Sequence, residues 1–187
     1  MGRLIYTLNA SVDGYIETAD KSLDWSVGDD ELLAWFTERA HGISASLYGP
    51  RLYQMMSSYW PTAEDDPAAT ETARAFGRRW VAIPKIVFSS TLTEVEWNSR
   101  LVRGDVGEEL ARIRSEIDGD YEVAGPTLAA EFVRRGLVDR FELVIHPVIL
   151  GGGTPYLPSL DAPVRLRLTD TRTFASGVIY LGYDAVR

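Results

Sequence analysis

The feature that most constrains the fold of this chain is a pair of glycine-containing turns, one in its middle and one in its last third. The first, Gly125-Pro126-Thr127-Leu128, follows the strand-like stretch 121–124 and begins a short helix that Gly136 ends. The second is the run Gly151-Gly152-Gly153. Turns without bulky side chains let backbone N–H groups and a helix N-terminus approach an anionic group closely. The two turns therefore indicate a cofactor whose pyrophosphate they hold.

Each turn also has a purely structural interpretation. Gly125-Pro126 can be a tight strand-to-helix connection, and the chain lacks the Gly-x-Gly-x-x-Gly fingerprint of an ordinary Rossmann domain at this point. The run 151–153 can be a wide β-bulge or a loop. However, three consecutive glycines lose much conformational freedom on folding, so such a run implies a backbone requirement. That requirement is close approach to a ligand, at Gly152 for example, or to the Gly125 turn.

The remaining patterns alternate between strand and helix and then end in strands. β-forming residues predict strands over 3–9, 43–48, 84–90 and 121–124. Helical signals predict helices that begin at Asp29-Asp30-Glu31 and that cover residues 50–60 and 105–118. The C-terminal part predicts strands from Arg140, around 164–174 and over 177–184, with a hairpin turn at 175–177. This order predicts an α/β fold with a mixed sheet, mostly parallel in its centre, and helices on both faces.

Composition excludes several classes of function. The 19 basic and 27 acidic residues give a net charge of −8, which disfavours nucleic-acid binding. The absence of cysteine excludes disulfides, thiolate zinc sites and cysteine nucleophiles. The two histidines, His41 and His146, lie far apart, and no acidic cluster has metal-ligand spacing, so no metal site is expected. No apolar run reaches the length of a signal peptide or a membrane span, which predicts a cytoplasmic protein that does not contact membranes.

Hydroxyl and arginine side chains follow two of the predicted strands. Ser89-Ser90-Thr91 follows one strand, and Gly49-Pro50-Arg51 follows another. The carboxyl ends of strands are where open α/β sheets bind ligands, and a guanidinium pairs well with phosphate. The alternatives are a serine-rich turn and an ordinary surface arginine. Trp25 lies in a predicted loop, where its ring can stack on a flat ligand.

Taken together, these segments resemble the dihydrofolate reductase-like superfamily, and specifically the riboflavin-biosynthesis reductase domain family. The resemblance covers nearly the whole chain, and the segments that carry it are 11–16, 48–53, 85–92, the Gly125 turn, 136–139 and 147–153. It implies one domain over residues 1–187, with a three-layer fold, a mixed sheet of about eight strands and NADPH bound across the strand ends. It also implies reduction of a pyrimidine- or pterin-like substrate, most like 5-amino-6-(5-phosphoribosylamino)uracil, and a homodimer.

The resemblance also implies roles for individual residues. Gly125, Pro126, Thr127 and Leu128 would face the cofactor diphosphate. Arg51, Ser89, Ser90 and Thr91 would lie near the adenosine and its 2′-phosphate. The loop that contains Asp13 and Gly14 would cover the nicotinamide end. Asp29, Asp30 and Glu31, at a helix start near the substrate end, are the candidates for substrate contact or proton relay.

Two positions depart from the family pattern. Pro50 replaces a frequent arginine, which leaves Arg51 as the charged phosphate ligand there and weakens the preference for NADPH over NADH. Gly125-Pro126 replaces a Gly-Gly pair that is sometimes cis, so we predict a cis Gly125–Pro126 peptide bond. Two other functions fit the same fold, a dihydrofolate or pterin reductase and a non-enzymatic nucleotide-binding protein, and a structural interaction module would bind no nucleotide.

Overall fold

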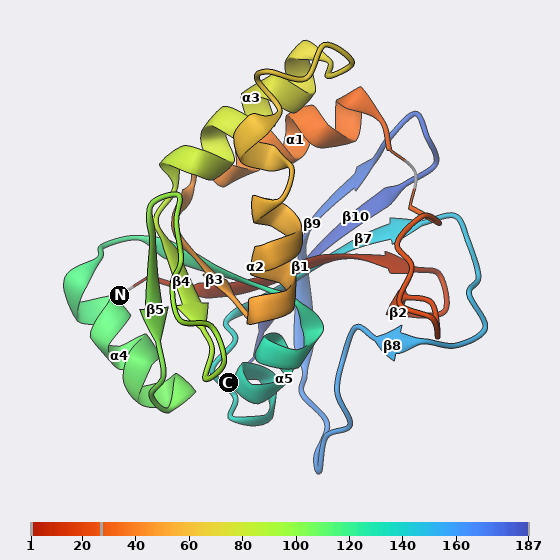
Figure 1. The fold of residues 1–187 in the computed structure, drawn as a ribbon. Coiled ribbons are helices and arrows are strands. Elements are labelled where there is room, and N and C mark those ends of the chain that lie inside the picture. Colours follow the sequence, from red (N-terminus) through yellow and green to blue (C-terminus); the bar gives the residue numbers. More distant parts are fainter. Residues whose placement is uncertain (1, 27, 187) are drawn as a thin grey trace. The chain divides into compact units, whose positions relative to one another are not determined.

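The structure, a computed structural model, describes residues 2–26 and 28–186 (Figure 1). These residues form two compact units. The first comprises Gly2 and residues 28–124, and the second comprises residues 3–26 and 125–186. The fold class predicted from the sequence is confirmed: the chain is an α/β protein with an eight-stranded, mostly parallel mixed sheet whose C-terminal strands are antiparallel.

The first unit contains four parallel strands. Their order is β5 (Ser99–Val102), β4 (Lys85–Phe88), β3 (Ile43–Tyr48) and β6 (Asp120–Ala124). The unit also contains the helices α1 (Asp30–Ala40), α2 (Pro50–Ser57), α3 (Glu71–Ala82) and α4 (Val106–Glu116), and the 3₁₀ turn η1 (Trp60–Thr62). The side chains of Asp29, Thr70 and Asp105 cap the N-termini of α1, α3 and α4. These caps fix where each helix begins, because they accept hydrogen bonds from otherwise unpaired N–H groups.

Aromatic side chains fill a core cluster of this unit. Tyr48 and Val87, from neighbouring parallel strands, pack with Tyr53 of α2 and Trp80 of α3. All four are at most 5% exposed. Burial of side chains of this size is the main stabilising contribution to such a unit. The cluster therefore holds α2 and α3 against the sheet.

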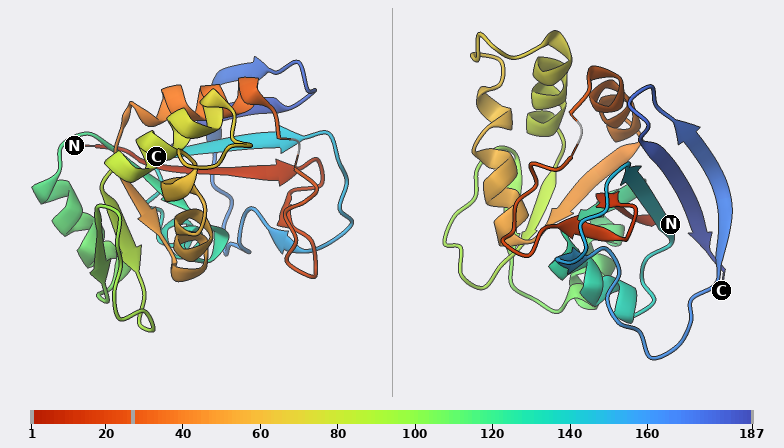
Figure 2. Two further views of the ribbon diagram at one scale, coloured as in Figure 1. Left: turned by 45° about the horizontal axis from the view of Figure 1, so that its top comes forward. Right: turned by 90° about the vertical axis from the view of Figure 1, so that its right-hand side faces the viewer.

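The second unit contains the other four strands of the sheet and a small separate sheet (Figures 1 and 2). The strand order is β1 (Leu4–Ser11), β7 (Arg140–His146), β10 (Ile179–Ala185) and β9 (Leu166–Thr173). β1 and β7 are parallel, whereas β10 is antiparallel to both of its neighbours. The small sheet pairs β2 (Tyr15–Glu17) with β8 (Thr154–Pro155), and the helix of this unit is α5 (Pro126–Arg134).

Two short strands and one helix boundary differ from the sequence predictions. The predicted helix over 50–60 is α2, which ends at Ser57, followed by η1. Pro61 has no backbone N–H, so the chain cannot continue as one regular helix through it. β5 and β8, of four and two residues, were not predicted, because strands of that length show too little alternation.

Lys85 begins β4 and is 1% exposed. Its Nζ donates hydrogen bonds to the carbonyl oxygens of Trp80 and Ile83, at 2.6 and 2.8 Å, and lies 4.3 Å from the centre of the Trp80 ring. These carbonyls belong to the C-terminal end of α3, where a positive charge is favourable. Burial, with a smaller contribution from Arg79, nevertheless lowers the pKa of Lys85 to about 8.

Relative to the variant Lys85→Met, we expect the free energy of unfolding of the wild-type protein to rise between pH 8 and about pH 10. The pKa of a lysine in the unfolded chain is about 10.4, so in this window the unfolded state binds more protons than the folded state. The gain should be about 1–2 kcal/mol. Urea unfolding at half-unit pH steps measures it. The same pH series on Lys85→Met gives the reference, and an equal change with pH in the two proteins would assign the change to groups other than Lys85.

Candidate active site

The carboxyl ends of β1 and β7 meet at one edge of the second unit. Ser11 and His146 are paired in register there, and both are 1% exposed. The Ser11 hydroxyl donates to Asp13 Oδ1 at 2.6 Å, and the Asp13 carboxylate accepts the backbone N–H groups of Leu150 (3.0 Å) and Gly151 (2.8 Å). The hydrogen bond from Ser11 is the largest of the causes that hold the pKa of Asp13 below its usual range. An ionised Asp13 thus ties the loop after β1 to the glycine run after β7.

The glycine run contacts the β2 segment through its backbone. Gly151 has a φ of 73° and Gly153 a φ of 131°. A Cβ on Gly153 would lie 1.9 Å from the carbonyl oxygen of Glu17 in β2, so no larger residue fits there. Gly152 has open space around it. The backbone requirement inferred from the sequence is therefore met, at Gly153, by contact with β2, and a ligand role for Gly152 stays a prediction.

Trp25, predicted to lie on the substrate side, lies edge-on to His146. The two rings are 5.4 Å apart between centroids with an interplanar angle of 87°. His146 Nε2 lies 3.0 Å from Asn9 Oδ1, so this histidine has a partner in the sheet. The indole Nε1 of Trp25 is buried and has no hydrogen-bond partner in the described part of the chain. A buried N–H without a partner is rare, and a bound ligand or water can provide the missing acceptor.

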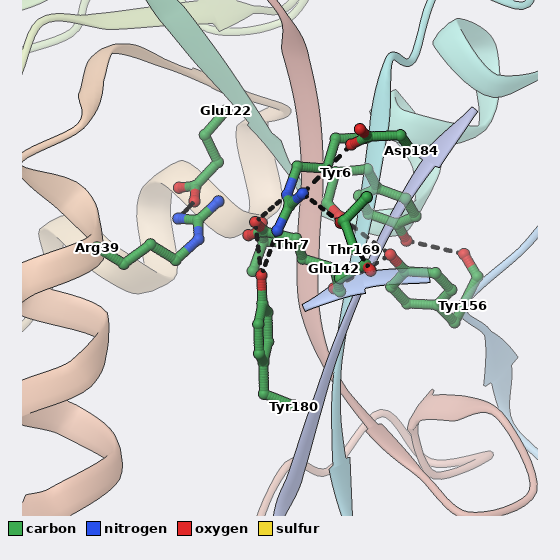
Figure 3. Close-up of polar contacts among 11 residues, drawn as sticks. Tyr6, Thr7, Arg39, Glu122, Glu142, Tyr156, Thr169, Tyr180 and Asp184 are labelled. Atoms are coloured by element: carbon green, nitrogen blue, oxygen red, sulfur yellow. Dashed lines mark hydrogen bonds and ion pairs between the residues drawn. The ribbon is translucent and has the colours of Figure 1, made fainter. Parts of the chain in front are cut away.

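A buried polar network lies on the side of β7 and β10 that carries Glu142 and Tyr180 (Figure 3). Glu142 accepts hydrogen bonds from Arg140 Nε (2.7 Å) and Tyr180 OH (2.9 Å) through Oε1, and from Thr7 Oγ1 (2.9 Å) through Oε2. Burial, and then the adjacent Glu142 charge, raises the pKa of Tyr180 to about 12. Sequence reasoning missed this network. One sequence pattern could have revealed the network. Polar residues stand at alternate positions of β1 (Thr7, Asn9) and β7 (Arg140, Glu142), and alternate residues of a strand face the same side.

Two of the predicted cofactor segments lie at one edge of the first unit. β3 and β4 are parallel neighbours, so Gly49-Pro50-Arg51 and Ser89-Ser90-Thr91 follow their carboxyl ends at the same edge. Arg51 is exposed in the first turn of α2. Ser89 is 7% exposed, and its hydroxyl accepts the backbone N–H groups of Thr91 (3.2 Å) and Leu92 (3.0 Å). Ser89 therefore shapes the turn, and Ser90 and Thr91 are exposed on it.

The turn at Gly125 directly follows β6 and begins α5. The predicted cis Gly125–Pro126 bond is wrong, because no peptide bond among the described residues is cis. Instead, Gly125 turns the chain with φ 92° and ψ 130°, a conformation that residues with a Cβ rarely adopt. No side chain caps α5, and Pro126 occupies its first position. The N–H groups of Thr127 and Leu128 in this first turn have no acceptor within the helix, which leaves them suited to an anionic ligand.

The three candidate proton donors differ in their surroundings. Asp29 caps α1 by accepting the Leu32 N–H at 2.5 Å. Asp30 is exposed and accepts from Thr70 Oγ1 at 2.9 Å, and Glu31 is exposed. A cap explains the presence of Asp29 without any catalytic role, so a role in proton transfer stays a prediction for all three. Within the described residues, no group of His, Asp and Glu side chains is arranged to hold a metal ion, and no helix is long and apolar enough to cross a membrane.

Comparison with known proteins identifies relatives along the whole chain. The model of the RibD C-terminal domain family matches residues 3–180. An uncharacterized protein of Bacillus subtilis (strain 168), YyaP, is 31% identical over 182 residues, which are 97% of this chain and 94% of that protein. A putative riboflavin biosynthesis protein from Shewanella sp. PV-4 is 20% identical, with a TM-score of 0.72 and full coverage of both chains. Dihydrofolate reductase from Enterococcus faecalis, complexed with NADP(H), is 16% identical, with a TM-score of 0.67 and coverage of 99% and 97%.

These matches confirm the resemblance inferred from the sequence. The two solved structures show the dihydrofolate reductase-like fold, and the family is one of NADPH-dependent reductases whose members bind NADP(H). The family model spans nearly the full sequence and includes the Gly125 turn, the β1–β7 edge and the glycine run. The chain belongs to the RibD C-terminal domain family.

Proposed function

We propose that this protein is an NADPH-dependent reductase of a small pyrimidine- or pterin-like substrate, most like 5-amino-6-(5-phosphoribosylamino)uracil reductase. The observation that carries the proposal is the Gly125 turn. Its positive φ requires glycine, so no Cβ obstructs the approach of a ligand, and the N-terminus of α5 that follows has no side-chain cap. The residues present therefore fit a diphosphate, and the family relationship supports the same ligand.

The cofactor supplies the hydride when it is bound, and the protein supplies binding, orientation and exclusion of water. The backbone N–H groups of Thr127 and Leu128 would hold the diphosphate. The Trp25 indole N–H donates to an acceptor atom of the substrate or nicotinamide. Asp13, through its bonds to Leu150 and Gly151, fixes the loop after β1 that would cover the nicotinamide end. One of the carboxyls of Asp29, Asp30 and Glu31 would provide the proton that the reduced substrate takes up.

Titration with NADPH, followed by tryptophan fluorescence and calorimetry, tests binding. Turnover is then measured with ribosylaminopyrimidine phosphates and with dihydropterins. Turnover of the pyrimidine supports the proposal, and turnover of the pterin alone supports a pterin reductase instead. Saturable binding without turnover of any of these substrates supports a non-enzymatic nucleotide-binding protein. No binding at all contradicts the proposal.

Gly125→Ala should weaken NADPH binding at least tenfold. A methyl group at φ 92° forces the backbone to move, and the N–H groups of the α5 first turn move with it. The matched control is Gly136→Ala. Gly136 also has a positive φ, of 64°, and open space around it, but it follows the other end of α5. This control should carry a smaller backbone strain, because a φ of 64° lies in the left-handed region that residues with a Cβ can adopt. It should leave the dissociation constant within twofold, so equal losses in both variants would contradict a diphosphate site at Gly125.

Arg51→Gln tests the proposed 2′-phosphate site. A guanidinium–phosphate pair contributes about 1.5–3 kcal/mol, which is roughly a 10- to 150-fold change in affinity. We expect the variant to lose affinity for NADPH and to keep its affinity for NADH, because NADH lacks that phosphate. Calorimetry gives the dissociation constants for NADPH and NADH in the wild type and in the variant. If the ratio of these two constants is the same in both proteins, Arg51 does not recognise the 2′-phosphate.

A further inference from the structure

A cleft opens at the edge of the first unit that lies opposite the candidate cofactor segments of that unit. It is formed by the amino ends of β4 and β5 and by the C-terminal end of α4 (Figure 1). The segments Gly49-Pro50-Arg51 and Ser89-Ser90-Thr91 instead follow the carboxyl ends of β3 and β4. The volume of the cleft is about 550 Å³, within the range of small-molecule sites. Much of its wall is apolar and comes from Pro84, Ile86, Val95, Trp97 and Ile117.

The bend that leads into β5 places a tryptophan in the wall of this cleft. Trp97 and Asn98 both have left-handed backbones, with φ of 60° and 55°. Asparagine adopts this conformation readily, but it is unfavourable for a bulky residue such as tryptophan. Glycine or asparagine would form the same bend at a lower cost. The presence of tryptophan therefore indicates a use for its ring, and Trp97 is 39% exposed.

The bend is held in place by α2, α3 and β4. The Tyr53 hydroxyl of α2 donates to the carbonyl oxygen of Glu96 (3.0 Å) and accepts the N–H of the same residue (2.7 Å). The Asn98 side chain donates to the last carbonyl of α3 at 2.8 Å, and the Asn98 carbonyl accepts the N–H of Lys85 at 2.9 Å. A strained backbone persists only where its surroundings fix it in this way. Trp97 is therefore presented on a rigid backbone, which lowers the entropy cost of binding a ligand.

Arg100 lines the same cleft and carries two donors that lack an acceptor. Its Nη1 donates to Glu116 Oε2 at 2.7 Å. Its Nε and Nη2 are shielded from solvent and have no hydrogen-bond partner in the part of the chain that the structure describes. The N–H groups of these two atoms form the edge of the guanidinium that binds two adjacent acceptor atoms at once. The Arg100 side chain as a whole is 38% exposed, so a rotation of the guanidinium turns this edge into the cleft.

The charges of the cleft favour an uncharged ligand. Glu116 already balances the guanidinium of Arg100, so a ligand carboxylate or phosphate would meet the Glu116 carboxylate, and a ligand ammonium would lie beside the guanidinium. The exposed carboxylate of Glu96 adds to the repulsion of an anion. The guanidinium donates hydrogen bonds and accepts none, so a ligand amino group is unfavourable next to it. The cleft therefore suits a flat ring that stacks on Trp97 and presents two neutral acceptor atoms side by side.

We propose that this cleft binds an uncharged fused heterocycle that carries a carbonyl oxygen next to a ring nitrogen, as 6-oxopurines and 4-oxopteridines do. The ring stacks on Trp97, and the carbonyl oxygen and the ring nitrogen accept the N–H groups of Arg100 Nε and Nη2. Arginine recognises guanine through the same pair of acceptor atoms. The site involves none of the residues assigned to the cofactor or to the substrate, so this inference does not depend on the proposed reductase activity.

Inosine and adenosine are the matched probes, because they share a purine ring and a ribose but differ at position 6. Inosine has a carbonyl oxygen there, whereas adenosine has an amino group that would point at the Arg100 donors. Binding is followed through the amide and indole N–H signals in NMR spectra of the labelled protein, with each nucleoside added up to about 10 mM. We expect both to shift the Trp97 indole signal and the amide signals of residues 97–100. Inosine should bind at least about fivefold more tightly than adenosine.

Two variants separate the contribution of the ring from that of the guanidinium. Trp97→Asn supplies a residue that adopts the left-handed bend, and it should weaken the binding of both nucleosides by about fivefold or more. Arg100→Lys keeps a positive charge beside Glu116 but loses the parallel N–H pair, so it should make the two dissociation constants equal. The matched control is Arg112→Lys. Arg112 pairs with another glutamate of α4, Glu109, at 3.1 Å but does not line the cleft, so this variant should keep the preference for inosine.

Equal affinity of the wild-type protein for inosine and adenosine would overturn the inference, because the protein would then recognise the ring alone. Tighter binding of benzoate, a flat anion, than of inosine would also overturn it. Shifts confined to residues 89–91 or 125–128 would place the nucleoside at the proposed cofactor turns, and the absence of any shift at residues 97–100 would exclude the cleft. Retention of the inosine preference in Arg100→Lys would contradict the role of the guanidinium. Circular dichroism checks that each variant is folded, and the different effects expected of Trp97→Asn and Arg100→Lys keep the test decisive if one of them is unstable.

Discussion

Glu142→Ala should lower the free energy of unfolding by about 3–5 kcal/mol, the loss expected when one partner of a buried ion pair is removed. The side chains of Glu142 and Arg140 are 6% and 12% exposed. Removal of the carboxylate takes one acceptor at 2.7 Å from the guanidinium of Arg140, which keeps Thr169 Oγ1 at 2.7 Å and Asp184 Oδ1 at 3.2 Å. It also takes the acceptor from the Thr7 and Tyr180 hydroxyls. Desolvation of these groups is then no longer offset. Urea unfolding at pH 7 measures the loss.

The control for Glu142 is another glutamate–arginine pair in the same unit. Glu131 pairs with Arg134 on α5 at 3.0 Å, but both side chains are about half exposed, at 50% and 51%. Solvent-exposed pairs contribute little, so Glu131→Ala should change the free energy of unfolding by less than about 0.5 kcal/mol. The double variant Arg140→Met/Glu142→Leu should recover part of the loss, because it removes both buried charges but leaves the Thr7 and Tyr180 hydroxyls without their acceptor. Equal losses for Glu142→Ala and Glu131→Ala would mean that burial is not the cause.

Local sequence signals predicted the elements well where the signal lies within the element itself. The strand 43–48 is β3, with the same bounds, because apolar residues alternate with serines over Ile43–Leu47 and the stretch ends at Gly49-Pro50. The helix that was predicted to begin at Asp29 does so through that side chain. The hairpin turn at 175–177 is closed by a hydrogen bond from Gly177 N–H to Phe174 O at 3.0 Å, with Gly177 at φ 84°. Each of these features depends on neighbours only a few residues away.

The parts that were not predicted depend on residues far apart in the chain. Thr7 and Glu142 are separated by 135 residues, and their contact follows from the register of β1 against β7, which no local pattern specifies. The cis bond predicted at Gly125 was wrong because the sequence cannot distinguish a cis proline from a positive φ at the preceding glycine, and both reverse the chain. The glycine run indicated a close backbone contact. The sequence did not identify the contacting residue, because Glu17 lies in β2, far from the run in the chain.

Gly153→Ala should destabilise the protein by about 3 kcal/mol or more, because two separate penalties act at one residue. The new Cβ would lie 1.9 Å from the Glu17 carbonyl oxygen, and a φ of 131° is unfavourable for any residue with a Cβ. The backbone of β2 or of the 151–153 loop must move, which breaks the pairing of β2 with β8. Urea unfolding measures the global loss. Hydrogen exchange of the Tyr156 amide, which donates to Gly14 O at 2.9 Å, reports the local one.

The adjacent residue provides a matched control for Gly153. A Cβ on Gly152 would meet no heavy atom within 4 Å, and its φ is not positive, so Gly152→Ala should change the free energy of unfolding by no more than about 0.5 kcal/mol. The two variants carry the same substitution, glycine to alanine, at neighbouring positions. If they lose the same stability, the run is merely a flexible connection. If only Gly153→Ala loses stability, the third glycine is required by the contact with β2, and Gly152 is left as the member of the run that is open to a ligand.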